Sequence, residues 1–324
     1  MLPIAVDAMG GDRAPGEIVA GAHQAADAGF PVVLIGPEGL DGAGDLPLIV
    51  ASEVIEMDDD PASSVRKKRD STLVRAAEAV RDGKASAMIS AGNTGATMAS
   101  ALLRMGRIKG VHRPAIATPV PVPGSTPTVL LDAGANAEVQ AEWLVQFAVM
   151  GSVYARKRYG IENPKVGLLS IGEEPGKGDT LRKEAYDLLA AAQGINFIGN
   201  VEGRDIMTDT VDVVVTDGFT GNVVLKTLEG TLRGVIKALF EAITQPEYKE
   251  HADALMPALL PMYATFDPEN TGGAILLGID GVCIISHGSS TSRAMVNGIK
   301  VAQEMVQTDM VGAIREAISA TTND

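Results

Sequence analysis

The stretch LPIAVDAMGGDRAPGEIVAGAHQAADAGFPVVLIG (2–36) decides the fold class of this chain. It opens with an apolar strand pattern at 2–9 and turns through small residues into an amphipathic helical pattern at 14–28, for which Asp12 is the expected N-cap. A second apolar strand pattern follows at 31–36. A helix between two strands is typical of a right-handed crossover in a parallel sheet.

The same alternation of strand and helix patterns continues along the chain. Further strands are predicted at 47–52, 86–91, 115–122, 128–133, 165–172, 195–200, 211–217 and 282–288. Further helices are predicted at 72–81, 94–105, 139–159, 179–193, 221–243 and 290–306. Several strands are apolar throughout, which indicates burial on both faces. We therefore predict a three-layer αβα sandwich with a mainly parallel sheet.

The domain organisation follows from the absence of a flexible linker. We expect one α/β domain over residues 1–324, with a helical protrusion at about 244–270 that Pro257 and Pro261 interrupt. The proline-rich segment PVPVPGSTP (119–127) is interpreted as an irregular edge or hairpin segment within that domain.

Composition excludes several classes of protein. With 27 basic and 41 acidic residues the net charge is −14, which argues against a nucleic-acid-binding protein. An anionic substrate or acidic partner must then meet a local basic patch. Cys283 is the single cysteine, so an intrachain disulfide is excluded, and its strand context GVCIIS predicts a buried thiol rather than a nucleophile. No signal peptide and no run of about 18 apolar residues is present in the sequence.

Clusters of Gly, Asn and Asp follow the predicted strands. Backbone N–H groups at the start of a helix can bind an anion, and glycine lets that anion approach closely. We expect these turns to gather at one edge of the sheet and to form a polar cleft for an anionic substrate. The turns are DAMGGD (7–12), SAGNTGA (90–96), DAGAN (132–136), IGEEPGKGD (171–179), TDGFTGN (216–222) and SHGSS (286–290).

None of these turns matches a nucleotide-binding fingerprint. No G-x-G-x-x-G follows a strand and no G-x-x-x-x-G-K-[ST] occurs, which disfavours a dinucleotide dehydrogenase and a P-loop kinase. No spacing of His, Cys or Asp residues suggests a metal site. The four histidines, His23, His112, His251 and His287, are scattered.

The motifs DAMGGD, SAGNTGA and DGFTGN (217–222) together resemble those of the PlsX-type phosphate acyltransferases of bacterial phospholipid synthesis, and the resemblance runs nearly end to end. The other segments that carry it are KRDSTLVRAAEAV (68–80), LLDAGAN (130–136), VGLLSIGEE (166–174), KEAYDLL (183–189), VTDGFTGNVVLKTLEG (215–230) and GGAILLGIDGVCIISHGSS (272–290).

This resemblance implies a fold like that of the isocitrate and isopropylmalate dehydrogenases and the phosphotransacetylases. It implies a cytoplasmic homodimer with an active cleft near the subunit interface and no cofactor. The implied reaction transfers a long-chain acyl group from acyl carrier protein (ACP) to inorganic phosphate. The resemblance also implies a downstream acylglycerol-phosphate synthesis enzyme as a partner.

Site residues follow from the chemistry that this reaction requires. Phosphate attack on a thioester needs proximity and fixed positive charge rather than a covalent intermediate. Lys177 is the expected cation for phosphate or the oxyanion, although it could be a solvated loop residue. Asp217 could orient Lys177 or phosphate, or act as a base, and Asn222 and Asn93 could bind phosphate or cap helices. The remaining expected cleft residues are Asp7, Gly10, Gly11, Thr94, Gly95, Gly134, Asn136, Gly218 and His287.

Two basic sets stand out in this acidic chain as expected docking sites for the acidic ACP, with ordinary solvated faces as the alternative. The first comprises Arg66, Lys67, Lys68 and Arg69. The second comprises Arg104, Arg107 and Lys109, with His112 and Arg113 close behind in the sequence.

An apolar segment at 254–266 is the counterpart of a membrane-contacting tip that the resemblance implies. Its expected contact residues are Leu255, Met256, Leu259, Leu260 and Met262. An interfacial helix normally carries basic residues, whereas this segment is surrounded by acidic ones. A dimer contact or an acyl-chain groove is therefore an alternative role for it.

Three other functions compete with this interpretation. A short-chain phosphotransacetylase would use acyl-CoA instead of ACP. A non-catalytic assembly protein for lipid synthesis would bind ACP or liposomes without forming acyl-phosphate. A decarboxylating dehydrogenase of the same fold would need a metal-binding carboxylate cluster and a nucleotide loop, and the sequence shows neither.

Overall fold

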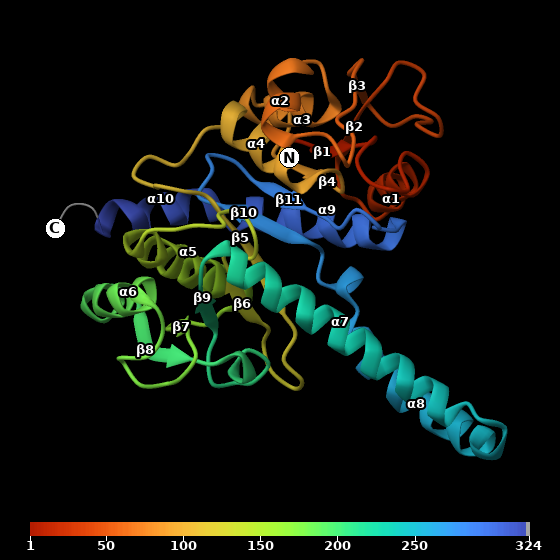
Figure 1. Ribbon diagram of the computed structural model, residues 1–324. Helices are drawn as coiled ribbons and strands as arrows, with labels where there is room; N and C mark the ends of the chain where they lie inside the picture. The colour runs from red at the N-terminus through yellow and green to blue at the C-terminus, as the bar shows by residue number, and fades with distance from the viewer. Residues whose placement is uncertain (322–324) are drawn as a thin grey trace.

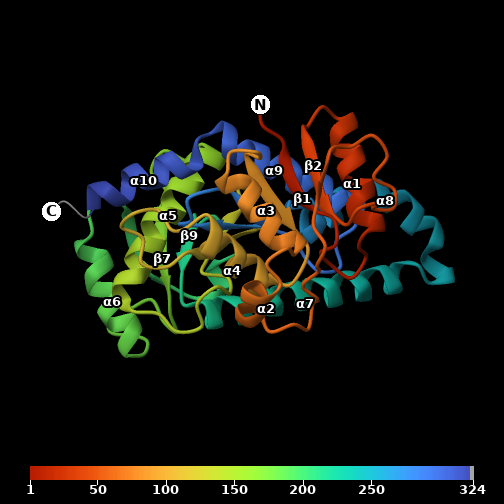
Figure 2. The same ribbon diagram turned by 90° about the horizontal axis from the view of Figure 1, so that it is seen from above.

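The computed structural model describes residues 1–321 of the chain, apart from the side chain of Glu250. Its strands form one sheet in the order β3-β2-β1-β4-β11-β10-β5-β6-β9-β7-β8, with helices on both faces (Figures 1 and 2). The α/β class and the mainly parallel sheet predicted from the sequence are confirmed.

The strands are β1 (Ile4–Asp7), β2 (Val32–Gly36), β3 (Leu48–Val50), β4 (Ala87–Ser90), β5 (Ala115–Val120), β6 (Thr128–Leu131), β7 (Lys165–Leu169), β8 (Asn196–Val201), β9 (Val213–Val215), β10 (Ala274–Leu277) and β11 (Cys283–Ile285). The α-helices are α1 (Gly16–Asp27), α2 (Pro61–Lys67), α3 (Thr72–Arg81), α4 (Thr94–Arg104), α5 (Ala141–Tyr159), α6 (Thr180–Ala191), α7 (Gly218–Ile243), α8 (Lys249–Phe266), α9 (Ser292–Gln307) and α10 (Met310–Thr321). Short 3₁₀ helices are η1 (Gly203–Asp205), η2 (Pro246–Tyr248) and η3 (Pro268–Asn270).

The sheet consists of two parallel halves that run in opposite directions. Strands β1 to β4 and β11 are parallel to one another, and so are β6 to β9. Between them, β10 pairs antiparallel with β11 and β5, and β5 pairs antiparallel with β6. The expectation that all the glycine-rich turns share one edge is therefore wrong. The turns after β1, β4 and β11 open on one edge, and those after β6, β7 and β9 open on the other.

Alternating side chains of the strands build a core on each face of the sheet. Ile4 and Val6 of β1 pack with the cluster that also takes in α1, α5, α9 and α10. Ala5, between them, packs on the other face with residues of α3 and α4. This alternation follows from the period of two residues in a strand. A third, smaller cluster joins β5, β6, β7 and β9 to the first half of α7.

Several elements differ from the sequence-based expectation. Strand β10 and helices α2 and α10 were not predicted. Helix α1 begins after Pro15 without a side-chain cap, so the expected Asp12 cap is wrong. The physical reason is that residues 12–15 form an intervening turn, in which the Asp12 N–H binds the carbonyl of Gly288 at 2.8 Å.

The proline-rich segment connects β5 to β6 as a hairpin in the middle of the sheet, not at its edge. The pairing of β10 with β5 ends at Ala117, so residues 118–121 have no hydrogen-bonded strand on that side. Pro119, which has no N–H to donate, is tolerated for this reason.

Helices α7 and α8 form a hairpin that projects from the body of the molecule (Figure 1). The rings of Phe240 and Tyr263 meet edge to face across it, with centroids 6.2 Å apart. Helix α7 starts at the edge of the sheet where β9 ends and extends past the sheet into the projection, so it connects the sheet to the hairpin.

Candidate active site

The turns after β1, β4 and β11 pack against one another through their backbones. The Asp12 N–H donates to the Gly288 carbonyl, and a Cβ added to Gly10 would lie only 2.8 Å from the nitrogen of Gly92. Gly11 has φ +107°, a conformation that other residues rarely adopt. These glycines therefore allow three turns to meet at one edge of the sheet.

Asp7, at the end of β1, is buried under these turns and hydrogen-bonded to one of them. Its carboxylate is buried and accepts a 2.7 Å hydrogen bond from the Ser90 hydroxyl, which in turn accepts the N–H of Gly92. Burial raises the pKa of Asp7, and the hydrogen bonds from Thr72 and Ser90 offset only part of that rise. Asp7 thus fixes the turns from within the core.

The side chain of Asn93 forms its hydrogen bonds with nearby backbone groups. Its Oδ1 accepts the N–H of Ala96 and so caps α4, while its amide nitrogen donates to the carbonyls of Met57 and Asp59 at 3.0 Å. These contacts match the capping alternative for this residue. Thr94 follows it and is exposed, and Gly95 is half-buried.

The turns after β6 and β9 form a second packed group on the opposite edge. Asp132 is fully buried and accepts hydrogen bonds from the N–H groups of Gly134 and Asn136, among others. Burial raises the pKa of Asp132, and these hydrogen bonds counter the rise in part. The Gly218 N–H donates to the Asn136 carbonyl at 2.7 Å, which joins the two turns.

Asp217 caps α7 and pairs with Arg182 of α6, which sequence reasoning missed. Its carboxylate accepts the N–H and the hydroxyl of Thr220 at 2.8 Å each and forms a short ion pair with Arg182. Burial alone would raise the pKa of Asp217, but the bonds from Thr220 and the charge of Arg182 together lower it. The cation beside Asp217 is therefore Arg182, not Lys177. A lowered pKa makes this carboxylate a poor base.

Lys177 lies on an exposed loop between β7 and α6. Among the described residues its ammonium group has no hydrogen-bond or ion-pair partner, so it is available to a ligand. Asn222, in the first turns of α7, is exposed and lies beside Gly134, where an added Cβ would be 3.6 Å from its own Cβ.

Lys226 brings the two edges into contact. It lies four residues after Asn222 and therefore on the same face of α7. Its Nζ lies 3.4 Å from Nε2 of His287 and 2.8 Å from Glu229. The Nδ1 of His287 lies 3.0 Å from the Ser289 hydroxyl. A polar cluster of Asn222, Lys226 and His287 thus spans from the β6 turn to the β11 turn. The helical spacing from Asn222 was the only sequence signal for Lys226.

The two basic sets differ in how free their charges are. Arg66, Lys67 and Arg69 are exposed, whereas Lys68 is tied to Asp59 and to the Val54 carbonyl. In the second set, Arg104 lies 3.7 Å from Glu78, Arg107 donates to the His112 carbonyl, and Arg113 stacks on Trp143. Lys109 is exposed.

The expected tip residues lie on α8. Leu255, Leu260 and Met262 are exposed, and Met256 and Leu259 are partly covered. In the described part of the chain, no helix is long and apolar enough to cross a bilayer, and no group of acidic, His or Cys side chains could hold a metal ion. Cys283 is buried, which raises the pKa of its thiol to about 12.

Comparison with known proteins places the chain in a family. The profile of a family described as "Fatty acid synthesis protein" matches residues 2–312. A phosphate acyltransferase of Pelotomaculum thermopropionicum is 49% identical, over 98% of this chain and 96% of its own.

Solved structures of low identity share the fold. A phosphotransacetylase from Streptococcus pyogenes gives a TM-score of 0.61 at 16% identity, over 98% of this chain and 94% of that one. A 4-hydroxythreonine-4-phosphate dehydrogenase from Klebsiella pneumoniae gives 0.52 at 14%, over 95% and 100%. On the strength of the profile and the sequence identity, the chain belongs to the fatty acid synthesis protein family, the family of the phosphate acyltransferases.

Proposed function

We propose that this protein transfers a long-chain fatty acyl group from acyl-ACP to inorganic phosphate and releases acyl-phosphate for phospholipid synthesis. The observation that carries the proposal is the cluster of Asn222, Lys226 and His287, which lies between two sets of glycine-rich turns. Family membership supplies the reaction class. Polar donors beside a cation are what a phosphate dianion and a thioester oxyanion both require.

The chemistry needs no covalent enzyme intermediate. A phosphate oxygen attacks the thioester carbonyl carbon and forms a C–O bond, and the C–S bond breaks as the tetrahedral oxyanion collapses. The departing thiolate of the carrier then takes a proton from water or from phosphate. Because a thiol has a pKa of about 8.5, this departure needs little help from an acid. The enzyme contributes position and positive charge.

Each site residue has a part in this scheme. Lys177 and Lys226 offer cationic contacts for phosphate and the oxyanion, and Asn222 and His287 orient them. Asp217 and Arg182 hold the start of α7, and hence Asn222, in place. We assign Asp217 this positioning role because its pKa is lowered and its oxygens are occupied.

The acidic carrier would dock on the exposed cations of the first basic set, Arg66, Lys67 and Arg69, because the charge of Lys68 is already paired with the Asp59 carboxylate. We include a homodimer and a contact with the cytoplasmic face of the membrane in the proposal, on the grounds of the exposed apolar residues of α8. Acyl-phosphate is reactive, so a downstream acylglycerol-phosphate synthesis enzyme would receive it directly.

The test measures phosphate-dependent release of ACP from hexadecanoyl-ACP, with hexadecanoyl-CoA in parallel. The proposal predicts release from ACP, little from CoA, and a loss of activity in Lys177→Ala. Lys183→Ala is the control, because Lys183 is also an exposed lysine near the start of α6.

Preference for CoA would favour a phosphotransacetylase. Release from neither carrier, together with binding of ACP or liposomes, would leave a scaffold. Full activity in Lys177→Ala would keep the function but remove that residue from the site.

A further inference from the structure

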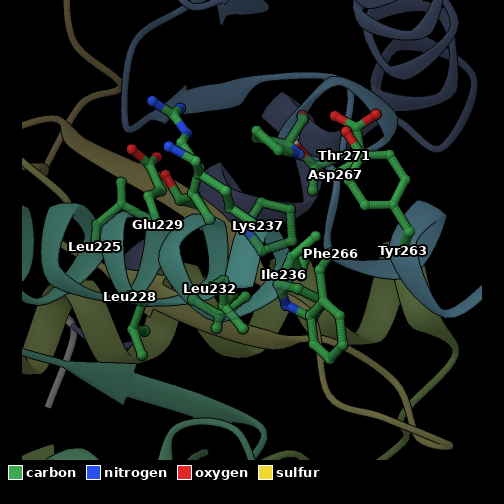
Figure 3. A pocket seen from close by; sticks show the side chains of 16 residues that line it. Leu225, Leu228, Glu229, Leu232, Ile236, Lys237, Tyr263, Phe266, Asp267 and Thr271 are labelled. Carbon is green, nitrogen blue, oxygen red and sulfur yellow. Dashed lines mark hydrogen bonds between the residues drawn. The ribbon is translucent and has the colours of Figure 1, made fainter. Parts of the chain in front are cut away.

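A cavity of about 320 Å³ is lined by residues of α7, the end of β5 and the end of α8. Figure 3 shows its labelled side chains on α7 and α8. Its wall on α7 is one stripe at helical spacing, formed by Leu225, Leu228, Glu229, Leu232, Arg233, Ile236 and Lys237. Phe266 and Tyr263 of α8 close one end. Most of the exposed wall is apolar, which is typical of a small-molecule site of this size, and its charged groups belong to Glu229, Arg233, Lys237 and Asp267.

The other end of this cavity adjoins the polar cluster. Leu225 lies between Asn222 and Lys226 in the sequence, and Glu229, which also lines the cavity, binds Lys226 at 2.8 Å. From Leu225 to Lys237 the stripe extends about 18 Å along the helix. The cavity therefore extends along α7 from the neighbourhood of the candidate active site, with a wall that is mostly apolar.

Thr118 of β5 supplies an independent sign of a ligand. Its hydroxyl oxygen has almost no exposure and no hydrogen-bond partner within the described chain, and Thr118 lines the cavity. A buried hydroxyl without a partner is costly, and a ligand acceptor would satisfy it.

The position of Thr118 along β5 indicates at which end of the cavity a ligand would accept the hydrogen bond of its hydroxyl. The neighbouring residue Ala117 pairs with Leu131, just before the β6 turn, and Asn222 of α7 lies beside Gly134 of that turn. Pro119 and Val120 complete β5, Pro121 follows it, and these residues line the cavity together with Thr271, which follows α8. Of the β5 residues that line the cavity, Thr118 is therefore the one nearest to the β6 turn and to the polar cluster of Asn222, Lys226 and His287.

We propose that this cavity holds the fatty acyl chain of the substrate, with its thioester carbonyl at Thr118 and Leu225 and its methyl end toward Tyr263 and Phe266. The inference rests on the proposed function and specifies where that reaction binds its acyl group. A hydrocarbon chain suits the leucines of the stripe, and the carbonyl oxygen is the acceptor that the Thr118 hydroxyl lacks. Residues of the stripe then set the preference for chain length.

The test fills the cavity at its middle. Leu232→Trp should lower kcat/KM for hexadecanoyl-ACP at least about tenfold more than for octanoyl-ACP, because an added indole removes space that only the longer chain needs. Val235→Trp is the matched control, since Val235 lies on the same helix, is 62% exposed and does not line the cavity. Thr118→Val should lower kcat/KM for both chains by a similar factor, and Thr118→Ser should restore it.

A second measurement works without turnover. Binding of the fluorescent fatty acid cis-parinaric acid should be lost in Leu232→Trp and kept in Val235→Trp. If the wild type binds this probe but forms no acyl-phosphate from either carrier protein substrate, the proposed function fails while the cavity stands.

Equal chain-length profiles or equal probe binding in the two tryptophan variants would overturn the inference. So would sedimentation showing that Leu232→Trp alone separates a dimer into monomers, because the stripe would then be a contact between two copies of the chain.

Discussion

Removing the Arg182 side chain should destabilise the protein by about 3 kcal/mol, because it would leave Asp217 buried without its cation. Arg182 is only 11% exposed and Asp217 8%, so water cannot replace the lost contact fully. The guanidinium also binds the hydroxyls of Thr216 and Thr220 at 3.1 Å each. At about 2 °C for each kcal/mol in a chain of this size, Arg182→Ala should lower Tm by about 6 °C.

The assay is thermal unfolding followed by circular dichroism, with Arg204→Ala as the control. Arg182 pairs with Asp179 as well as Asp217, and Arg204 likewise pairs with two carboxylates, Glu173 and Glu202. Arg204 is 70% exposed, however, and exposed pairs contribute about 0–1 kcal/mol. Equal shifts in Tm for the two variants would refute the argument that burial gives the Arg182 pair its weight.

The lowered pKa of Asp217 also predicts how the stability difference between wild type and Arg182→Ala depends on pH. The pKa of Asp217 is lower in the folded protein, so its stabilising contribution is complete above the unfolded-state pKa of about 3.9. It is lost as the pH falls through the lower folded-state value. The difference in stability between wild type and Arg182→Ala should therefore be constant near neutral pH and shrink only in strong acid.

Three further predictions follow from single contacts. Gly221→Ala should unfold the protein or lower its free energy of unfolding by several kcal/mol in urea titrations, because the added Cβ would overlap the Asp132 carbonyl. Gly230→Ala on the same helix is the control: its added Cβ meets open space, so the change should be neutral or stabilising by up to about 1 kcal/mol. Lys226→Ala should raise the KM for phosphate at least about tenfold in the ACP-release assay, and an unchanged KM would exclude Lys226 from the phosphate site. Cys283, with its thiol pKa raised to about 12, should react with Ellman's reagent at pH 8 only after denaturation, and rapid native labelling would contradict its burial.

The sequence predicted most of the individual elements, because hydrophobic periodicity is a local property. Helix α3 was predicted with its exact bounds, and the strand–turn–helix pattern of residues 2–36 was sound apart from the helix start. Strand β10 was missed because AILL is four residues long and is surrounded by glycines, so its pattern is too short to distinguish.

The candidate site was predicted in part. The glycine-rich turns were found. Asp217 caps α7, Asn222 lies in the first turns of that helix, and His287 lies in the turn after β11. Arg182 and Lys226 were missed because the sequence shows each only as a cation on a helix. Their roles depend on contacts with Asp217 and His287, which are distant in the sequence. Lys177 and the basic residues that were assigned to docking stay predictions.

The sequence by itself determined the α/β class, the family resemblance and the turns that could meet an anion, since each depends on residues that are neighbours in the chain. Only the tertiary structure decided that the two halves of the sheet run in opposite directions, because strand direction depends on pairing between distant segments. It also decided that α7 joins the two edges and that Asp217 faces Arg182. These are contacts between residues 35 to 61 positions apart, and no local pattern records such a separation.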